Sequence, residues 1–101
     1  MLAVLAQLQQ EHYGYTLRKA LAVGGVDMDE GTLYPLLRRL ETQGLLASEW
    51  RMEEKRNKRF YRLSAAGTEV LGQLLTEWRE MNVSLDRILE SASAKTESLQ
   101  E

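Results

Sequence analysis

The sequence predicts a mainly α-helical fold with one small β-hairpin and a long C-terminal helix. Within residues 1–44, three segments of helical character are separated or ended by glycines. Two short aromatic-containing runs then flank a charged hexapeptide, EEKRNK, which is typical of a hairpin. Finally, apolar residues repeat at heptad spacing from residue 71 to residue 88. With 101 residues, 44% of them hydrophobic and 28% charged, the chain has the length and composition of one globular domain.

The first two helices are expected at residues 1–9 and 14–23. The first segment is rich in alanine, leucine and glutamine, and the second places Tyr15, Leu17, Leu21 and Ala22 where they can form an apolar face. Gly24 and Gly25 end the second helix, because glycine readily takes the left-handed conformation that closes a helix. His12 is expected in the turn between these helices, where Gly14 allows close packing.

The third helix is expected within residues 29–43 and ends before Gly44. Its leucines recur with the spacing of one buried stripe: Leu33, Leu36, Leu37 and Leu40. The first turn has two possible forms. If Asp29 is the N-cap, Pro35 lies inside the helix, whereas if Thr32 is the N-cap, Pro35 falls in the first turn, where no amide is needed. We expect an irregular first turn or a slight kink.

The hairpin is expected to pair residues 45–52 with 59–64, with Trp50 packed under it. Ser64 then caps a helix that reaches about residue 90. Residues 91–101 contain almost no apolar side chains and are expected to form a disordered tail. This order of elements predicts a winged helix-turn-helix domain over residues 1–64, followed by a long dimerisation helix over residues 65–90.

Charge is distributed unevenly along the chain. The net charge is −2, yet residues 38–62 carry 8 basic and 4 acidic side chains, and residues 65–101 carry 3 basic and 7 acidic ones. A basic patch inside an otherwise acidic chain is typical of a nucleic-acid contact surface. The expected contacts are outward residues of the third helix and cations of the hairpin tip: Thr32, Tyr34, Pro35, Arg38, Arg39, Lys55, Arg56, Lys58 and Arg59.

Each of these residues also has a purely structural interpretation. The polar face of the third helix could simply face solvent, and a charged hairpin tip is often only a solvated loop, here with Glu53 and Glu54 beside it. A winged-helix module that binds proteins and not DNA is therefore the alternative function. An enzyme is not expected, because there is no cysteine, only one histidine and no glycine-rich phosphate loop. We expect no catalytic residue, no metal site and no cofactor.

The C-terminal helix carries a dimerisation seam. Its apolar residues are spaced alternately by three and four: Leu71, Leu74, Trp78, Met81, Leu85 and Ile88. A helix of about 26 residues is about 39 Å long, more than a domain of this size can cover. The seam therefore predicts a homodimer. No apolar run reaches the roughly 18 residues of a membrane helix, so neither a membrane span nor a membrane partner is expected, and a cytoplasmic location is expected.

Three segments resemble the PadR-like family of transcriptional regulators: HYGYTL at 12–17, DEGTLYPLLRRLETQGLL at 29–46 and RFYRLSAAG at 59–67. The similarity is to the small subgroup with a single C-terminal helix, whose members usually carry several more residues before the first helix. It implies a homodimeric regulator, most often a repressor, that binds double-stranded DNA at a near-palindromic operator. In some similar members a central tryptophan pair stacks planar aromatic molecules, which implies an effector site at Trp78 and Met81.

Overall fold

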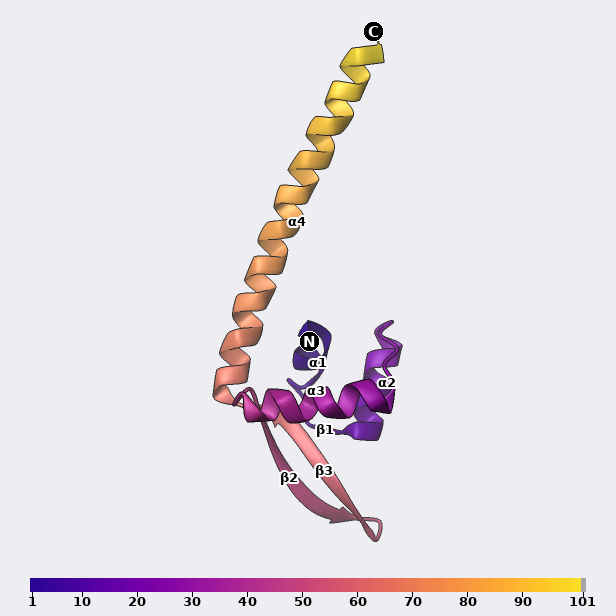
Figure 1. Ribbon diagram of the computed structural model, residues 1–101, viewed down its shortest axis with the longest axis vertical. Helices are drawn as coiled ribbons and strands as arrows, with labels where there is room; N and C mark the ends of the chain where they lie inside the picture. Colours follow the sequence, from indigo (N-terminus) through magenta and orange to yellow (C-terminus); the bar gives the residue numbers. More distant parts are fainter. Residues whose placement is uncertain (101) are drawn as a thin grey trace. The chain divides into compact units, whose positions relative to one another are not determined.

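The computed structural model describes the backbone of residues 1–100 and the side chains of residues 1–93. Its elements follow in the order α1 (Leu2–Gln7), β1 (His12–Tyr13), α2 (Gly14–Val23), α3 (Glu30–Thr42), β2 (Leu46–Glu53), β3 (Arg56–Leu63) and α4 (Ala65–Gln100) (Figure 1). The chain divides into two compact units, Met1–Leu71 and Gly72–Glu101. None of the helices in the described part of the chain is long and apolar enough to cross a lipid bilayer.

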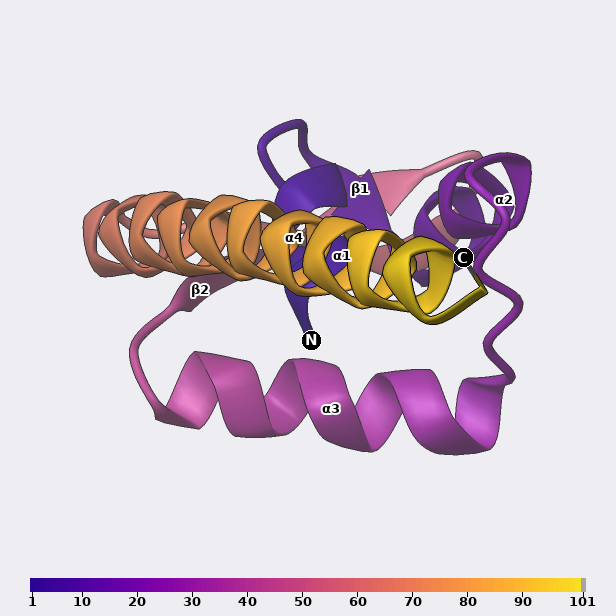
Figure 2. The ribbon, with the colours of Figure 1, turned by 90° about the horizontal axis from the view of Figure 1, so that it is seen from above.

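The first unit contains three helices and a three-stranded antiparallel sheet in the order β1-β3-β2. Along one side of this unit, α3 runs from the loop that follows α2 to the loop that precedes β2 (Figure 2). The core is built mainly from leucines of the three helices, with Val4, Phe60 and Tyr61 beside them. The predicted mainly helical fold with a small β-hairpin and a long C-terminal helix is confirmed.

The strand β1 was not predicted, because two residues are too few to show an alternating pattern. His12 pairs with Tyr61 and Tyr13 with Phe60, so the segment between α1 and α2 joins the sheet. The amide of Tyr13 and Nδ1 of His12 both lie within hydrogen-bond distance of Oγ1 of Thr16, at 3.2 and 3.1 Å. His12 was expected in a turn between the first two helices but lies in β1, from which its ring contacts Thr16 in the first turn of α2.

Both helices of the helix-turn-helix end in the same way. After α2, the amide of Val26 donates to the carbonyl of Leu21, and after α3 the amide of Leu45 donates to that of Leu40. This bond pattern needs a left-handed residue just past the helix, a position that glycine takes without steric cost. Gly44 has φ +80°, as expected, whereas after α2 it is Gly25, at φ +89°, and not Gly24 that is left-handed.

The first turn of α3 follows the first of the two predicted forms. The Asp29 carboxylate accepts a hydrogen bond from the amide of Thr32 at 2.8 Å, so Asp29 is the N-cap and Pro35 lies inside the helix. The proline leaves the carbonyl of Gly31 without its helical donor, which is tolerable because Gly31 is exposed and water can bind there. The expected irregularity is absent, since α3 is unbroken from Glu30 to Thr42.

Two boundaries at the C-terminal side differ from the prediction. The first unit extends to Leu71 and not only to residue 64, because the first two turns of α4 pack on it: Leu71 is 3% exposed. Ser64 caps this helix as predicted, with its hydroxyl oxygen accepting the amide of Gly67 at 3.0 Å. At the other end, α4 continues to Gln100, where a disordered tail was expected from residue 91. Residues 91–100 contain no glycine or proline to end the helix, and residue 101 lies outside the described residues.

At Gly67, α4 lies against the loop between α3 and β2. A Cβ atom there would lie 1.9 Å from the backbone oxygen of Leu45, whereas a Cβ at Gly72 of the same helix would meet nothing within 4 Å. We therefore expect Gly67→Ala to lower the free energy of unfolding by about 1–3 kcal/mol through overpacking.

Gly72→Ala is the matched control. It should raise the free energy of unfolding by up to about 1 kcal/mol, because alanine is the better helix former. Urea unfolding followed by circular dichroism measures both changes. Equal effects of the two substitutions would contradict the packing of α4 against Leu45.

Candidate nucleic-acid interface

The orientation of α3 separates a buried face from an exposed one. The four leucines of the predicted stripe are all at most 8% exposed. The residues predicted to contact DNA from this helix are all exposed: Thr32, Tyr34, Pro35, Arg38 and Arg39. They divide between two sides of that face, because Tyr34 and Arg38 line a cavity with the hairpin and Thr32, Pro35 and Arg39 do not. The helix thus offers a continuous outward surface from its first turn to its last.

The start of α3 is fixed to α2 by polar contacts. Arg18 of α2 forms a 3.0 Å ion pair with Glu30 and also reaches the carbonyl of Met28 at 3.4 Å. Thr32, through its side chain and its backbone amide, holds the pKa of Asp29 below its ordinary value. The Asp29 carboxylate is therefore charged at neutral pH, and its negative charge interacts favourably with the positive end of the helix dipole. These contacts set the angle at which α3 leaves the turn.

The hairpin is longer and its turn tighter than the sequence predicted. The strands pair without interruption from Leu46 with Leu63 to Glu53 with Arg56, so only Glu54 and Lys55 form the turn. Both have positive φ, 51° and 64°, as the two central residues of a type I′ turn require. This turn matches the right-handed twist of the paired strands. Consequently Lys55 alone of the predicted tip cations lies in the turn, and Arg56, Lys58 and Arg59 are residues of β3.

Arg59 joins the hairpin to α3 and is not a free cation. Its guanidinium donates to Oε1 of Glu41 at 2.6 Å and to Oγ of Ser48 at 2.9 Å. The Ser48 hydroxyl in turn donates to the second carboxylate oxygen of Glu41. The three side chains close a network between the last turn of α3 and the base of the hairpin. The prediction of Arg59 as a tip cation is therefore corrected: its charge is paired with Glu41.

The opposite face of the sheet carries a second charged cluster. Arg51 pairs with Glu11 at 2.5 Å and with Glu49, and its guanidinium lies 4.6 Å from the Phe60 ring. The hydrogen bond from Arg51 lowers the pKa of Glu11, and the same bond raises the pKa of Arg51. Lys58, which the strand register also places on this face, lies 4.5 Å from the Tyr13 ring and 3.9 Å from a Glu54 oxygen. Lys58 also lines the cavity that lies beside α3.

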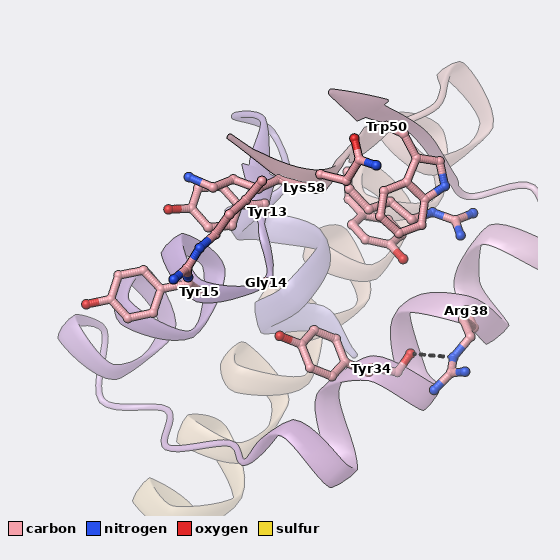
Figure 3. A pocket seen from close by; sticks show the side chains of 11 residues that line it. Tyr13, Gly14, Tyr15, Tyr34, Arg38, Trp50 and Lys58 are labelled. Carbon is pink, nitrogen blue, oxygen red and sulfur yellow. Dashed lines mark hydrogen bonds between the residues drawn. The ribbon is translucent and has the colours of Figure 1, made fainter. Parts of the chain in front are cut away.

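A cavity of about 530 Å³ lies between α3, the start of α2 and the hairpin (Figure 3). Five aromatic side chains line it: Tyr13, Tyr15, Tyr34, Trp50 and Tyr61. Four cations line it as well: Arg38, Arg56, Lys58 and Arg59. Gly14 lets Tyr34 approach the backbone, since a Cβ there would lie 2.5 Å from the ring. Burial raises the pKa of Tyr61, so its hydroxyl remains a hydrogen-bond donor at neutral pH.

The charge of this cavity is positive. Its lining, all within the described residues, includes no aspartate or glutamate. Among residues 1–93, whose side chains the structure describes, Arg38 and Arg56 form no ion pair, and Arg38 makes only a 3.4 Å hydrogen bond to the carbonyl of Tyr34. The site can therefore bind an anion and offer aromatic surface beside it.

The sequence analysis did not identify several of the residues that line this cavity, or expected them elsewhere. Trp50, expected under the hairpin, is 64% exposed. Tyr15, for which a place beside the DNA backbone and a place in the core were equally expected, is 57% exposed and so is not a core residue. Tyr13 and Tyr61 were not singled out, because they come together only through the pairing of β1 with β3. The periodicity of short segments cannot show which face of a sheet a neighbouring helix will cover.

Known proteins resemble this chain in sequence and in fold. Residues 1–73 match the PadR-like family of transcriptional regulators. Over 61 residues the chain is 44% identical to the transcriptional regulator Rv3488 of Mycobacterium tuberculosis, an alignment that covers 60% of this chain and 57% of that protein. The chain thus spans little more than half the length of this relative.

Solved structures of the family have the same fold. A PadR family transcriptional regulator from Eggerthella lenta is 42% identical, with a TM-score of 0.82 over 88% of this chain and 80% of that one. A PadR-like transcription factor from Bacteroides fragilis is 30% identical, with a TM-score of 0.79 over 86% of each chain. The chain belongs to the PadR-like family of transcriptional regulators, whose members bind DNA and are not enzymes.

The network of Glu41, Ser48 and Arg59 makes a prediction for stability. Glu41→Gln leaves the half-buried Arg59 guanidinium without its counter-ion, so the free energy of unfolding should fall by about 1–2 kcal/mol. Glu53→Gln removes the same charge from an exposed position of the hairpin and should change it by less than about 0.5 kcal/mol. Urea unfolding measures both, and a Glu41→Gln protein as stable as the control would refute a stabilising role for the network.

Proposed function

We propose that this chain represses transcription in the cytoplasm by binding a near-palindromic operator in double-stranded DNA as a homodimer. The observation that carries the proposal is the outward face of α3 beside a cationic, aromatic cavity. A major groove about 12 Å wide admits one helix, and the neighbouring cations would hold the phosphates that flank it. The family membership supports the same function.

The residues of α3 would have different tasks in this complex. Thr32 and Pro35 lie on the side of the exposed face away from the cavity and would contact base edges, for which the Thr32 methyl suits a thymine. Arg38 has the reach for a guanine or a phosphate, and Arg39 would add a phosphate contact. Tyr34 is 37% exposed and its hydroxyl would donate to the backbone. The preference for a particular operator sequence would thus depend on α3.

The hairpin would supply affinity that depends on salt. Lys55 in the turn and Arg56 and Lys58 on β3 would each neutralise a phosphate and release a counter-ion. Arg59 would act indirectly, by holding the hairpin at its place beside α3 through Glu41. We therefore assign phosphate contacts to the first three cations and a positioning role to the fourth.

We propose that the apolar stripe of α4 forms the dimer seam without Leu71. Leu71 is buried within its own unit, whereas Trp78, Met81, Leu85 and Ile88 are between 49 and 71% exposed, and Leu74 is half-buried. Burying four such side chains from each of two chains would stabilise a dimer by about 1.5–3 kcal/mol per side chain before the cost of association. Two α3 helices would then reach half-sites about 34–36 Å apart.

A planar aromatic effector that binds at the seam is a second proposal. Trp78 is 56% exposed and Met81 71% exposed, three residues apart on one face of α4. An indole ring stacks on flat aromatic molecules, and a thioether adapts to their edges. Binding between the two α4 helices would change how the dimer presents its two α3 helices to DNA.

A winged-helix module that binds only proteins is the alternative, and one experiment separates the two functions. A mobility-shift titration with a mixed-sequence DNA duplex at 50 and 200 mM salt should show binding that weakens steeply at the higher concentration. Absence of salt-dependent binding would contradict DNA binding and leave the protein-interaction module.

The cations of β3 give a quantitative form of this test. Arg56→Ala with Lys58→Ala should flatten the slope of log affinity against log salt by about 2, or about 1 for each lost phosphate contact. Arg87→Ala, which removes a cation from α4, should leave the slope unchanged. Fluorescence anisotropy with a labelled duplex measures all three proteins, and an unaltered slope in the double variant would remove the hairpin from the interface.

Trp78 is the residue on which both proposals for α4 depend. Trp78→Ala should raise the dissociation constant of the dimer by about 30-fold, because a buried tryptophan at an interface contributes about 2 kcal/mol. Val83→Ala, on the same helix but outside the stripe, should change it little. Sedimentation velocity at several concentrations measures both, and loss of ligand-induced quenching of fluorescence in Trp78→Ala tests the effector site. A Trp78→Ala dimer as tight as that of Val83→Ala would contradict the seam.

A further inference from the structure

Trp50 is the largest exposed apolar side chain of the hairpin. Trp50 lies on the face of β2 that looks toward α3. Ser48, two residues earlier and therefore on the same face, donates a hydrogen bond to Glu41 of α3. Trp50 is 64% exposed, and Met52, two residues nearer the turn on the same face, is 66% exposed. A tryptophan and a methionine in this position bury little of their own surface in the fold, which points to contact with a partner.

The surroundings of Trp50 define what that partner must offer. The Arg59 guanidinium lies 5.6 Å from the indole ring on the same face of the hairpin (Figure 3). Arg38 of α3 lines the same cavity, and so do Arg56 and Lys58, which the register places on the other face of β3; the described lining includes no acidic residue. A complementary occupant carries closely spaced negative charges and has apolar surface between them. The backbone of DNA has this alternation, because charged phosphates are separated by deoxyribose rings whose C–H groups are apolar.

We propose that one strand of the DNA duplex enters this cavity and that Trp50 packs its indole ring against a deoxyribose between phosphates held by Arg38 and Arg56. The inference rests on the proposed DNA binding and adds to it a contact that is neither ionic nor specific for a base. Met52 extends the same apolar surface toward the turn. The cavity is therefore the part of the interface that fixes the register of the backbone relative to α3.

A contact between an indole ring and a sugar has a distinct signature. It releases no counter-ion, so it contributes equally to log affinity at every salt concentration, whereas a lost phosphate contact also changes the slope. It is made to any sequence, so a mixed-sequence duplex is a sufficient probe. Trp50 differs in both respects from the cations that line the cavity with it.

The test compares Trp50→Ala and Trp50→Phe with the wild-type chain by fluorescence anisotropy on a labelled mixed-sequence duplex of about 24 base pairs, which spans two half-sites. Trp50→Ala should lower affinity about tenfold at each of four salt concentrations with the slope unchanged. Trp50→Phe should recover most of the loss, because a flat ring remains. Val23→Ala, at a position 90% exposed and outside the cavity lining, should bind as the wild type does.

Two further measurements identify the occupant. Thermal unfolding and sedimentation of Trp50→Ala should match the wild type, because the indole makes few contacts within the fold. A changed oligomeric state would overturn the proposal, since it would mean that a second copy of the chain covers Trp50. Unchanged affinity in Trp50→Ala, or a slope flattened as by loss of a cation, would overturn it as well.

The proposed function can fail separately from this inference. If the wild-type chain itself shows no salt-dependent binding to the duplex, the proposed DNA binding is refuted, and the proposed contact of Trp50 with DNA is refuted with it. If the wild type binds and Trp50→Ala binds equally well, DNA binding stands and only the role of Trp50 is refuted.

Discussion

Burial of the leucine stripe of α3 is the constraint on which the rest of the molecule depends. The four leucines recur at helical spacing, so covering them with the core rotates Thr32, Pro35 and Arg38 outward. At one end Asp29 and Arg18 fix the helix, and at the other Glu41 joins it to the hairpin. The outward face of α3 is thus a consequence of core packing: any change that lets α3 rotate would move the outward residues and the cavity together.

Much of the fold could be predicted because its signals are local. The leucine spacing, Gly44 and the Ser64 cap each depend on residues within about one or two turns, so the positions of α2, α3 and the start of α4 follow from the sequence. The strand β1 could not be found in the same way, because its two residues are extended only through pairing with β3. The end of α4 was placed too early, since low apolar content was given more weight than the absence of helix breakers.

The candidate site was predictable on α3 and less so elsewhere. A helix has one period, and once its buried face is known the exposed residues follow. In the hairpin, the charged run from Glu53 to Lys58 gave no sign that the turn has only two residues, so most of its cations were placed in a loop. The pairing of Arg59 with Glu41, 18 residues away, and the exposure of Trp50 depend on how the hairpin meets α3, which no short stretch of sequence specifies.

The proposed function requires that the two α3 helices of a dimer bind two symmetric half-sites in DNA. Selection of binding duplexes from a pool with about 30 randomised base pairs, followed by sequencing, tests it most directly. The expected result is an inverted repeat whose half-sites are centred about one helical turn apart, lost when Trp78→Ala dissociates the dimer. Enrichment of a single, unrepeated site, or of no sequence at all, would contradict it.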